Sequence, residues 1–547
     1  MKKSIKYLFA LVLGISLNSC KDSFLTQYPE GGVLLEDQYQ SLPDKLRGSV
    51  FGIYSKIYEY GGHDTFGKRS FDMYSDIQSG DMAMKKSNYG WFESYERGYY
   101  YAYTRSYAWS YNYEIIHLAN LCDKAMILDV DDQGVSMDKR VWAAIGSGET
   151  PTEEIAMNGY YYGQILALRG WCYSTLLDIF TDPRDVDNAD LTAKAMPIYV
   201  GKDIINDTLG APLSTVEEVY ERVYQDLSEA IDLLDYYSAF NQRSSKLEVD
   251  ADVARLMLAY AMLNHGDKSV KIAGGKNCYE IALEQAKAVI DGGKYPMLKN
   301  EDLFSTGFSD VNAANWLWGQ DVTVETTTAL GSFFGQVDIH SYSYAAAGDT
   351  KAIDSQLYDE IVSMGWDARK DWFRDPTMKF AYCPDGKFYS PKYKNVTDLD
   401  KVDRDWLCDN VFMRVEVAYL IAAEAAWSNG DNGTAASYLK MLCDERVIEG
   451  QETVEANWLA TLTTTDAVKN AIIYNWRVEM WGEGYSMQLL RRLEKTRTLG
   501  TNHLSRAEKT IDITGQDKEA FQCEIPTSET RYNPNIGSSK ESLTQKH

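Results

Sequence analysis

The sequence has no excess of positive charge. Its 55 lysine and arginine residues face 80 aspartate and glutamate residues, which gives a net charge of −25 at pH 7. Proteins that bind nucleic acid need clustered cations that neutralise phosphates, and electrostatic binding to anionic lipids needs a similar basic patch. The composition therefore argues against nucleic acid as a partner and against electrostatic attachment to a membrane surface.

Cysteine and histidine are also sparse, with 8 and 6 residues. No Cys-x-x-Cys, His-x-x-x-His or His-Glu-x-x-His pattern occurs, so the sequence predicts no zinc site, and we expect no cofactor. Apart from Cys20 the cysteines are odd in number and scattered, unlike a disulfide scaffold, and several fall on apolar helix faces as expected of buried thiols. They are Cys122, Cys172, Cys278, Cys383, Cys408, Cys443 and Cys523.

Long apolar runs are missing after the first twenty residues, which excludes a later membrane-spanning helix. The start of the chain is different, because Lys2, Lys3 and Lys6 precede an apolar stretch that ends in Leu17-Asn-Ser-Cys20. This pattern predicts a secretory signal peptide over residues 1–19. It resembles a bacterial lipoprotein signal, which implies that Cys20 is lipidated and that residues 20–41 form a tether; the alternative is an ordinary signal peptide with a chance cysteine.

Aromatic residues are abundant, with 39 Tyr, 17 Phe and 13 Trp. In a secreted protein this abundance favours recognition of sugars, because ring faces stack on apolar ligand faces while Tyr hydroxyl and Trp N–H groups form hydrogen bonds. For any single ring the alternative is a place in the core.

Helical spacing of apolar residues predicts a mostly α-helical fold. The central element runs from Glu154 to Phe180, between Pro151-Thr152 and Thr181-Asp182-Pro183. Its stripe of small residues, from Gly163 to Ser174, lets a second helix approach closely. We expect a capping box at Ser214 and Glu217. Predicted helix pairs are 42–59 with 103–128, the central helix with 215–234, 249–264 with 277–291, and 414–427 with 434–445.

Two regions lack this regularity. Residues 60–101 mix glycine with aromatic residues and show no clear periodicity, which favours a binding loop over a disordered one, since disorder disfavours aromatics. Residues 300–409 interrupt the helix pairs; Trp316-Leu-Trp318 there alternates like a short strand. Tyr89 and Trp91 in the first region are the sharpest candidates for stacking on a ligand, and the alternative is that they pack the loop onto the helices.

Several motifs follow one another in an order that carries a resemblance. They include Ala167-x-Arg169-x-x-Cys172-Tyr173, the helix beginning Ser214-Thr-Val-Glu-Glu, the segment from Tyr279 to Leu298, the block Trp476-Arg-Val-Glu479 with Glu483-Gly484, and the closing Ile525-Pro526. In this order the chain resembles the SusD/RagB family, surface lipoproteins that partner SusC-like TonB-dependent transporters in glycan uptake by Bacteroidetes. The motifs are structural, so they bear on the fold more than on the ligand.

The resemblance implies tetratricopeptide-like helix pairs in a superhelix beside a loop-rich mixed subdomain. It implies helical pairs over 42–299 with the aromatic loop at 60–101, the subdomain over 300–409, and further pairs with a closing segment over 410–547. It also implies an outer-membrane, cell-surface location through Cys20 and a glycan site made of an arc of rings. Carried over by region, the site residues are Tyr89, Trp91, Trp318, Tyr342 and Tyr344, with Asp76, Asn88 and Arg97 as hydrogen-bonding partners of sugar hydroxyls.

Two other functions stay open at this point. A helical groove also suits a peptide or another nutrient. A glycoside hydrolase needs two carboxylates in a cleft, and 80 acidic residues make some suitable pair inevitable. No Gly-x-Ser-x-Gly, Ser/His/Asp or phosphate-loop pattern occurs, so we expect a binding protein and not an enzyme.

Overall fold

The computed structural model describes residues 45–536, apart from the internal positions 59–61, 99–101, 182–190, 206–209, 242, 244, 269–271, 273, 324–329, 389–405 and 522. The predicted signal peptide and Cys20 lie outside the described residues. Among the helices that are described, none has the length and apolar character needed to cross a membrane.

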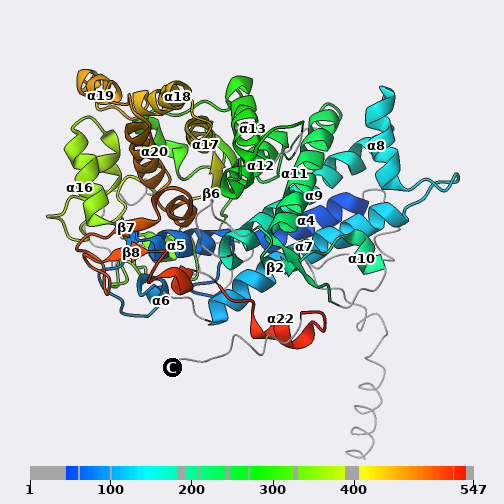
Figure 1. Cartoon of the computed structure of the whole chain (residues 1–547), viewed down its shortest axis with the longest axis horizontal. Helices are drawn as coiled ribbons and strands as arrows, with labels where there is room; N and C mark the ends of the chain where they lie inside the picture. Colours follow the sequence, from blue (N-terminus) through cyan, green and yellow to red (C-terminus); the bar gives the residue numbers. More distant parts are fainter. Residues whose placement is uncertain are drawn as a thin grey trace, which may run out of the picture.

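Long helices form a layered array along the molecule (Figure 1). They are α4 (Lys45–Ile57), α7 (Ala102–Leu128), α9 (Glu153–Phe180), α11 (Val216–Tyr237), α12 (Ala251–His265), α13 (Cys278–Gly292), α17 (Glu416–Ser428), α18 (Asn432–Asp444) and α20 (Thr465–Glu479). The four predicted pairs, α4 with α7, α9 with α11, α12 with α13 and α17 with α18, all pack together. Contacts of α7 with α9, α11 with α12, and α13 with α17 join the pairs into one array.

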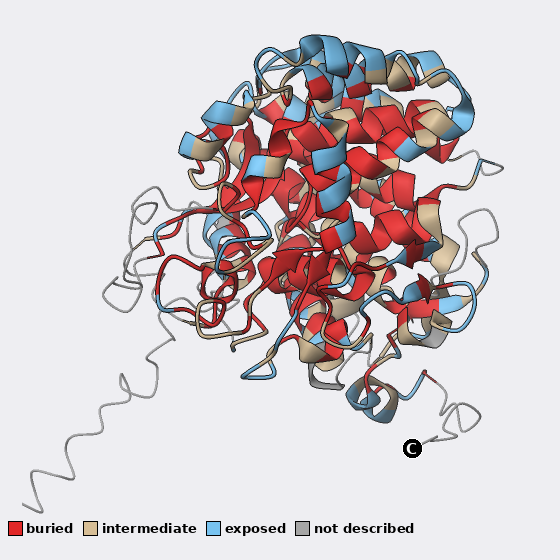
Figure 2. Ribbon diagram, turned by 90° about the vertical axis from the view of Figure 1, so that its left-hand side faces the viewer, coloured by how far each residue is buried: buried red, intermediate tan, exposed pale blue. Residues whose placement is uncertain are grey.

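Helix α9 is buried along most of its length, as Figure 2 illustrates for the interior of the array. Thr152 caps its first turn by accepting a hydrogen bond from the Ile155 N–H, as expected from the sequence. A Cβ atom on Gly163 would lie 2.8 Å from Leu234 Cγ, and one on Gly170 would lie 2.9 Å from Leu227 Cγ. The stripe of small residues therefore lets α11 approach closely, which confirms its predicted role.

The capping box of α11 is one residue later than predicted. Thr215, not Ser214, is the N-cap: its hydroxyl accepts the Glu218 N–H at 3.1 Å, and the Glu218 carboxylate accepts the Thr215 N–H at 2.6 Å. Ser214 lies instead in a short strand that pairs with residues 194–197. The sequence offered two equivalent Ser/Thr–Glu spacings, Ser214 with Glu217 and Thr215 with Glu218, and the structure uses the second.

The described residues include four short antiparallel strand pairs, two of which join segments far apart in the sequence. They are β1 (Met82–Ala83) with β5 (Ala352–Ile353), β2 (Lys194–Pro197) with β3 (Leu213–Thr215), β4 (Trp316–Gln320) with β6 (Asn410–Arg414), and β7 (Thr496–Thr498) with β8 (Thr510–Asp512). The predicted strand at Trp316-Leu-Trp318 is confirmed as part of β4.

Shorter helices complete the chain. They are α5 (Lys68–Ser79), α6 (Glu93–Glu96), α8 (Met137–Ser147), α10 (Gly201–Ile205), α14 (Asn300–Asp302), η2 (Leu303–Gly307), α15 (Phe333–Val337), α16 (Ser355–Met364), η3 (Ala368–Trp372), α19 (Glu452–Leu459), α21 (Ser486–Leu489), η6 (Leu490–Glu494), η7 (Lys518–Phe521) and α22 (Thr527–Tyr532). The expectation that residues 60–101 are irregular throughout is wrong, because α5 lies inside them. This helix buries polar groups such as Asp72 and Asp76 as well as apolar ones.

Buried apolar residues form two main cores. The larger one fills the helical array and includes Trp318. The second combines residues from 66–95, from 303–411 and from 474–481, so the early loop, the insert and α20 share one interior. All seven cysteines beyond Cys20 are buried, as the place of several of them on apolar helix faces suggested.

Candidate ligand-binding surface

The pairing of β1 with β5 brings the early loop beside the insert. Met82 lies opposite Ile353 and Ala83 opposite Ala352, although about 270 residues of chain separate the strands. The segment that follows β1 and the segment that precedes β5 therefore leave the pair side by side. Both carry predicted ligand residues.

Asp349 clamps the loop after β1. Its buried carboxylate accepts the backbone N–H of Asn88 and, at 3.2 and 3.3 Å, that of Tyr89. The Asn88 amide donates to the Ala347 carbonyl oxygen at 2.7 Å. Hydrogen bonds from backbone N–H groups to a carboxylate are charge-assisted and strong, so the tip of the loop has a defined position although Lys85, Lys86, Asn88 and Tyr89 are exposed.

Four rings meet at this tip, and we call them the ring cluster: His63, Tyr89, Trp91 and Tyr344. Tyr344 lies at its centre, with ring centroids 5.1 Å from Tyr89, 5.4 Å from His63 and 6.4 Å from Trp91, all edge to face. His63 and Trp91 are 4.8 Å apart. The edge-to-face arrangement leaves the Tyr89 ring 50% exposed, and Tyr342 beside the cluster in sequence is 44% exposed.

Buried polar groups support the ring cluster from behind. The Tyr344 hydroxyl and His63 Nδ1 are 2.9 Å apart, and Gln336 Nε2 donates to the His63 carbonyl oxygen at 2.7 Å. Lys351 Nζ in turn donates to Gln336 Oε1 at 2.7 Å. Burial lowers the pKa of Lys351 to about 7, which the negative charge of Asp349 opposes. The Trp91 indole N–H is buried and finds no acceptor within the part of the chain that the structure describes.

The structure brings together Asn88, Tyr89, Trp91 and Tyr344 among the predicted ligand residues. Tyr342 is exposed two positions from Tyr344. Arg97 is exposed on the C-terminal side of α6, where it pairs with Glu93 at 2.6 Å. The sequence analysis did not predict His63 as part of the ligand-binding surface, because histidines were considered there only as metal ligands. Its position next to Gly62, inside the aromatic segment, could have indicated this role.

Trp318 does not fit the predicted arc of exposed rings. It is only 1% exposed, and its indole N–H donates to the Leu247 carbonyl oxygen at 3.2 Å. The alternating pattern predicted the strand correctly, but β4 is buried along its whole length. A strand covered on both faces hides the residues that alternation assigns to the surface.

Asp76 is likewise buried, in α5, and does not face solvent. Its carboxylate accepts the Gly482 N–H at 2.6 Å and the Ser486 N–H at 3.4 Å. Burial raises its pKa to about 8, helped by the neighbouring charges of Asp81 and Asp72. The assignment of Asp76 to a hydroxyl-binding role is therefore corrected: this side chain joins α5 to the segment before α21.

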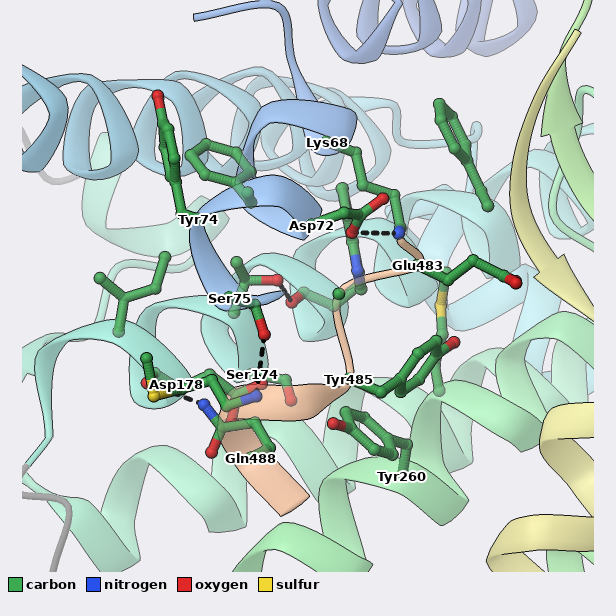
Figure 3. A pocket seen from close by; sticks show the side chains of 18 of the residues that line it. Lys68, Asp72, Tyr74, Ser75, Ser174, Asp178, Tyr260, Glu483, Tyr485 and Gln488 are labelled. Atoms are coloured by element: carbon green, nitrogen blue, oxygen red, sulfur yellow. Dashed lines mark hydrogen bonds and ion pairs between the residues drawn. The ribbon is translucent and has the colours of Figure 1, made fainter. Parts of the chain in front are cut away.

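Trp318 instead lines a partly open pocket of about 150 Å³, which we call the ring chamber (Figure 3). Helices α5, α7, α9, α12 and α17 and the segment 483–488 surround it. Lys68 and Asp72 form an ion pair at 2.8 Å on one side, and Asp178 and Gln488 lie on another (Figure 3). Burial raises the pKa of Asp178 to about 7, which Arg491 and Arg492 oppose.

The fold and the surface together define a class of protein in which an array of packed helices carries loops that present aromatic rings. Hydrogen bonds hold these loops in place. Two family models match the sequence: one described as starch-binding associating with outer membrane, over residues 53–258, and one described as the SusD family, over residues 384–538. These segments cover more than half of the chain. The chain belongs to the SusD/RagB family, as its motifs suggested.

Solved structures show the same fold. A SusD-like carbohydrate binding protein of Bacteroides vulgatus is 20% identical, with a TM-score of 0.65 over 90% of this chain and 97% of that one. A SusD superfamily protein of Bacteroides thetaiotaomicron is also 20% identical, with a TM-score of 0.65 over 90% and 98%. One from Bacteroides fragilis is 17% identical, with a TM-score of 0.64 over 91% and 99%. No protein with a curated description matches the sequence.

Proposed function

We propose that this protein binds an oligosaccharide or polysaccharide at the ring cluster. The observation that carries the proposal is the exposed Tyr89, whose ring is held edge to face against Tyr344 at 5.1 Å; Tyr342, two positions before Tyr344 in the sequence, is also exposed. Rings fixed in this way offer apolar faces to a sugar without losing side-chain freedom on binding. The family description as starch-binding and the name of the Bacteroides vulgatus relative support the same ligand class.

Delivery to a SusC-like TonB-dependent transporter is the second part of the proposal. Transfer to a transporter needs release, so an affinity in the micromolar range or weaker suits the task. Lipidation of Cys20 would hold the protein at the outer membrane, since each acyl CH₂ contributes about 0.8 kcal/mol to membrane binding. Changing Cys20 to Ser should move the protein from the membrane fraction to the soluble fraction.

Native affinity electrophoresis in gels containing a panel of polysaccharides tests the ligand. We expect one of them to retard the wild-type protein, and Tyr89→Ala and Trp91→Ala each to weaken that binding about tenfold or more, which corresponds to about 1.4 kcal/mol. Tyr532→Ala is the matched control, because Tyr532 on α22 is 78% exposed and outside the ring cluster. Equal retardation of all variants would remove the ring cluster as the site, and binding of peptides alone would replace the glycan with another nutrient.

A further inference from the structure

The ring chamber is large enough for a ligand and is separate from the ring cluster. Its volume of about 150 Å³ far exceeds the space that one buried water needs, about 10–15 Å³ on the same measure. A cavity of that size with apolar walls holds a benzene-sized molecule in other proteins. The chamber can therefore accept one six-membered or fused ring.

Its walls are predominantly aromatic. The rings that line it are Phe71, Tyr74, Tyr95, Trp171, Tyr260, Trp318, Phe412 and Tyr485. Trp171 and Trp318 meet edge to face with centroids 5.5 Å apart, and Tyr260 and Tyr485 do so at 5.0 Å. A flat ligand placed among rings makes the same offset or edge-to-face contacts that the rings make with one another.

The charged groups of the chamber already have partners. Asp72 is bonded by Lys68 at 2.8 Å and by Arg69 at 2.7 Å. Glu483 is paired with Arg414 at 2.9 Å and with Lys387 at 2.8 Å. A charged ligand would find no free counterion among these groups, and burying an unpaired charge is costly.

The lining also disfavours a free sugar, although the buried Tyr260 hydroxyl has no partner among the described residues. Each hydroxyl buried without a hydrogen-bond partner costs about 1–3 kcal/mol, and a monosaccharide carries several. The Asp178 carboxylate already accepts a hydrogen bond from the Asn264 amide at 3.1 Å. The Gln488 amide already donates to the backbone carbonyl oxygen of Asp178 at 3.0 Å. A ligand with one or two polar atoms fits this lining better than a polyol.

We propose that the ring chamber binds one small uncharged aromatic molecule, of the size of phenol or indole. Access is at Arg105, which lines the chamber and is partly exposed, and which pairs with the exposed Glu524 at 3.2 Å. This site is independent of the glycan site, because none of the ring-cluster residues lines the chamber. The protein would then recognise two ligands of different chemistry.

Isothermal titration calorimetry of the full chain with phenol and indole tests the proposal, with benzoate and D-glucose as charged and polyhydroxyl probes. We expect one site per chain for phenol or indole and none for the other two. Two variants fill the chamber: Ser174→Met on α9 and Ala108→Leu on α7, both at lining positions. Each should weaken binding at least tenfold, whereas Ala143→Leu, at an exposed position of α8, should leave it unchanged.

Several results would overturn the proposal. One is the absence of binding of either aromatic probe at millimolar concentration. Another is an affinity of both filled variants equal to that of the wild-type protein. A third is tighter binding of benzoate or D-glucose than of phenol or indole. If the filled variants do not fold, quenching of the tryptophan fluorescence by phenol decides. The quenching should decrease in Trp171→Phe, because Trp171 lines the chamber together with Trp318, and an unchanged quenching in this variant would contradict the proposal. Tyr89→Ala should leave phenol binding unchanged, so failure of the glycan site and failure of the chamber can be told apart.

Discussion

Glu479 is fully buried and its carboxylate contacts three arginines, whereas Tyr89 is half exposed and is held through its backbone by Asp349. Arg414 and Arg446 lie 2.7 and 2.9 Å from Glu479 Oε1, and Arg369 lies 3.3 Å from Oε2. Although burial alone would raise the pKa of Glu479, Arg446 and Arg414 hold it well below its usual range. We call these four residues the Glu479 network.

The difference shows how the fold separates rigidity from recognition. The Glu479 network joins α20 to β6, to η3 and to the chain that follows α18, so it fixes the insert against the helical array. Its charges are stable inside only because all of them are paired. The ring cluster uses backbone hydrogen bonds instead, which position the loop and leave ring faces free for a ligand.

The largest effect should come from breaking the Glu479 network. Glu479→Gln removes the negative charge that three buried arginines share, and breaking a buried pair costs about 3–5 kcal/mol. We expect a loss of at least that much in the free energy of unfolding, measured by urea denaturation. Glu449→Gln, at an exposed position, is the control and should change the free energy little. A stable Glu479→Gln protein would show that the network is not what fixes the insert.

Trp318→Ala should also act on stability and not on glycan binding. Removing a fully buried Trp from a core costs about 3–5 kcal/mol, while the ring cluster stays in place. We therefore expect a lower urea midpoint and an unchanged retardation by the cognate polysaccharide under conditions where the variant is folded. Lost retardation with unchanged stability would restore Trp318 to the glycan site and would remove the contrast between the two regions.

Asp349→Asn should loosen the loop more than the fold. The amide keeps one acceptor oxygen but loses the charge that strengthens the bonds to Asn88 and Tyr89, a loss of about 1–2 kcal/mol. We expect hydrogen exchange at these two amides to become at least tenfold faster and glycan affinity to fall severalfold. Asp375→Asn, which removes a carboxylate from an exposed turn at Thr377, is the matched control. Unchanged exchange in Asp349→Asn would show that other contacts hold the loop.

Sequence reasoning succeeded where structure is local and repetitive. The helix pairs follow from apolar spacing, and the close approach of α9 and α11 follows from small residues such as Gly163 and Gly170. It failed for α5, whose buried face includes Asp72 and Asp76, because the backbone N–H groups that bind the Asp76 carboxylate come from more than 400 residues away. The ring cluster was half predicted: Tyr89, Trp91 and Tyr344 carry a compositional signal, but only the pairing of β1 with β5 decides which rings meet.

A pH effect tests the corrected role of Asp76. Its pKa is about 8 in the folded protein and near 3.9 in an unfolded chain. Between these values the folded state keeps a proton that the unfolded state has released, so this residue's contribution is complete below about pH 4 and is lost as pH rises toward 8. Asp76→Asn abolishes the titration while its amide oxygen can still accept the Gly482 N–H. Relative to wild type, the variant should therefore gain stability from pH 5 to pH 8 in urea denaturation, with unchanged glycan retardation; parallel stability curves would mean that Asp76 stays ionised in the fold.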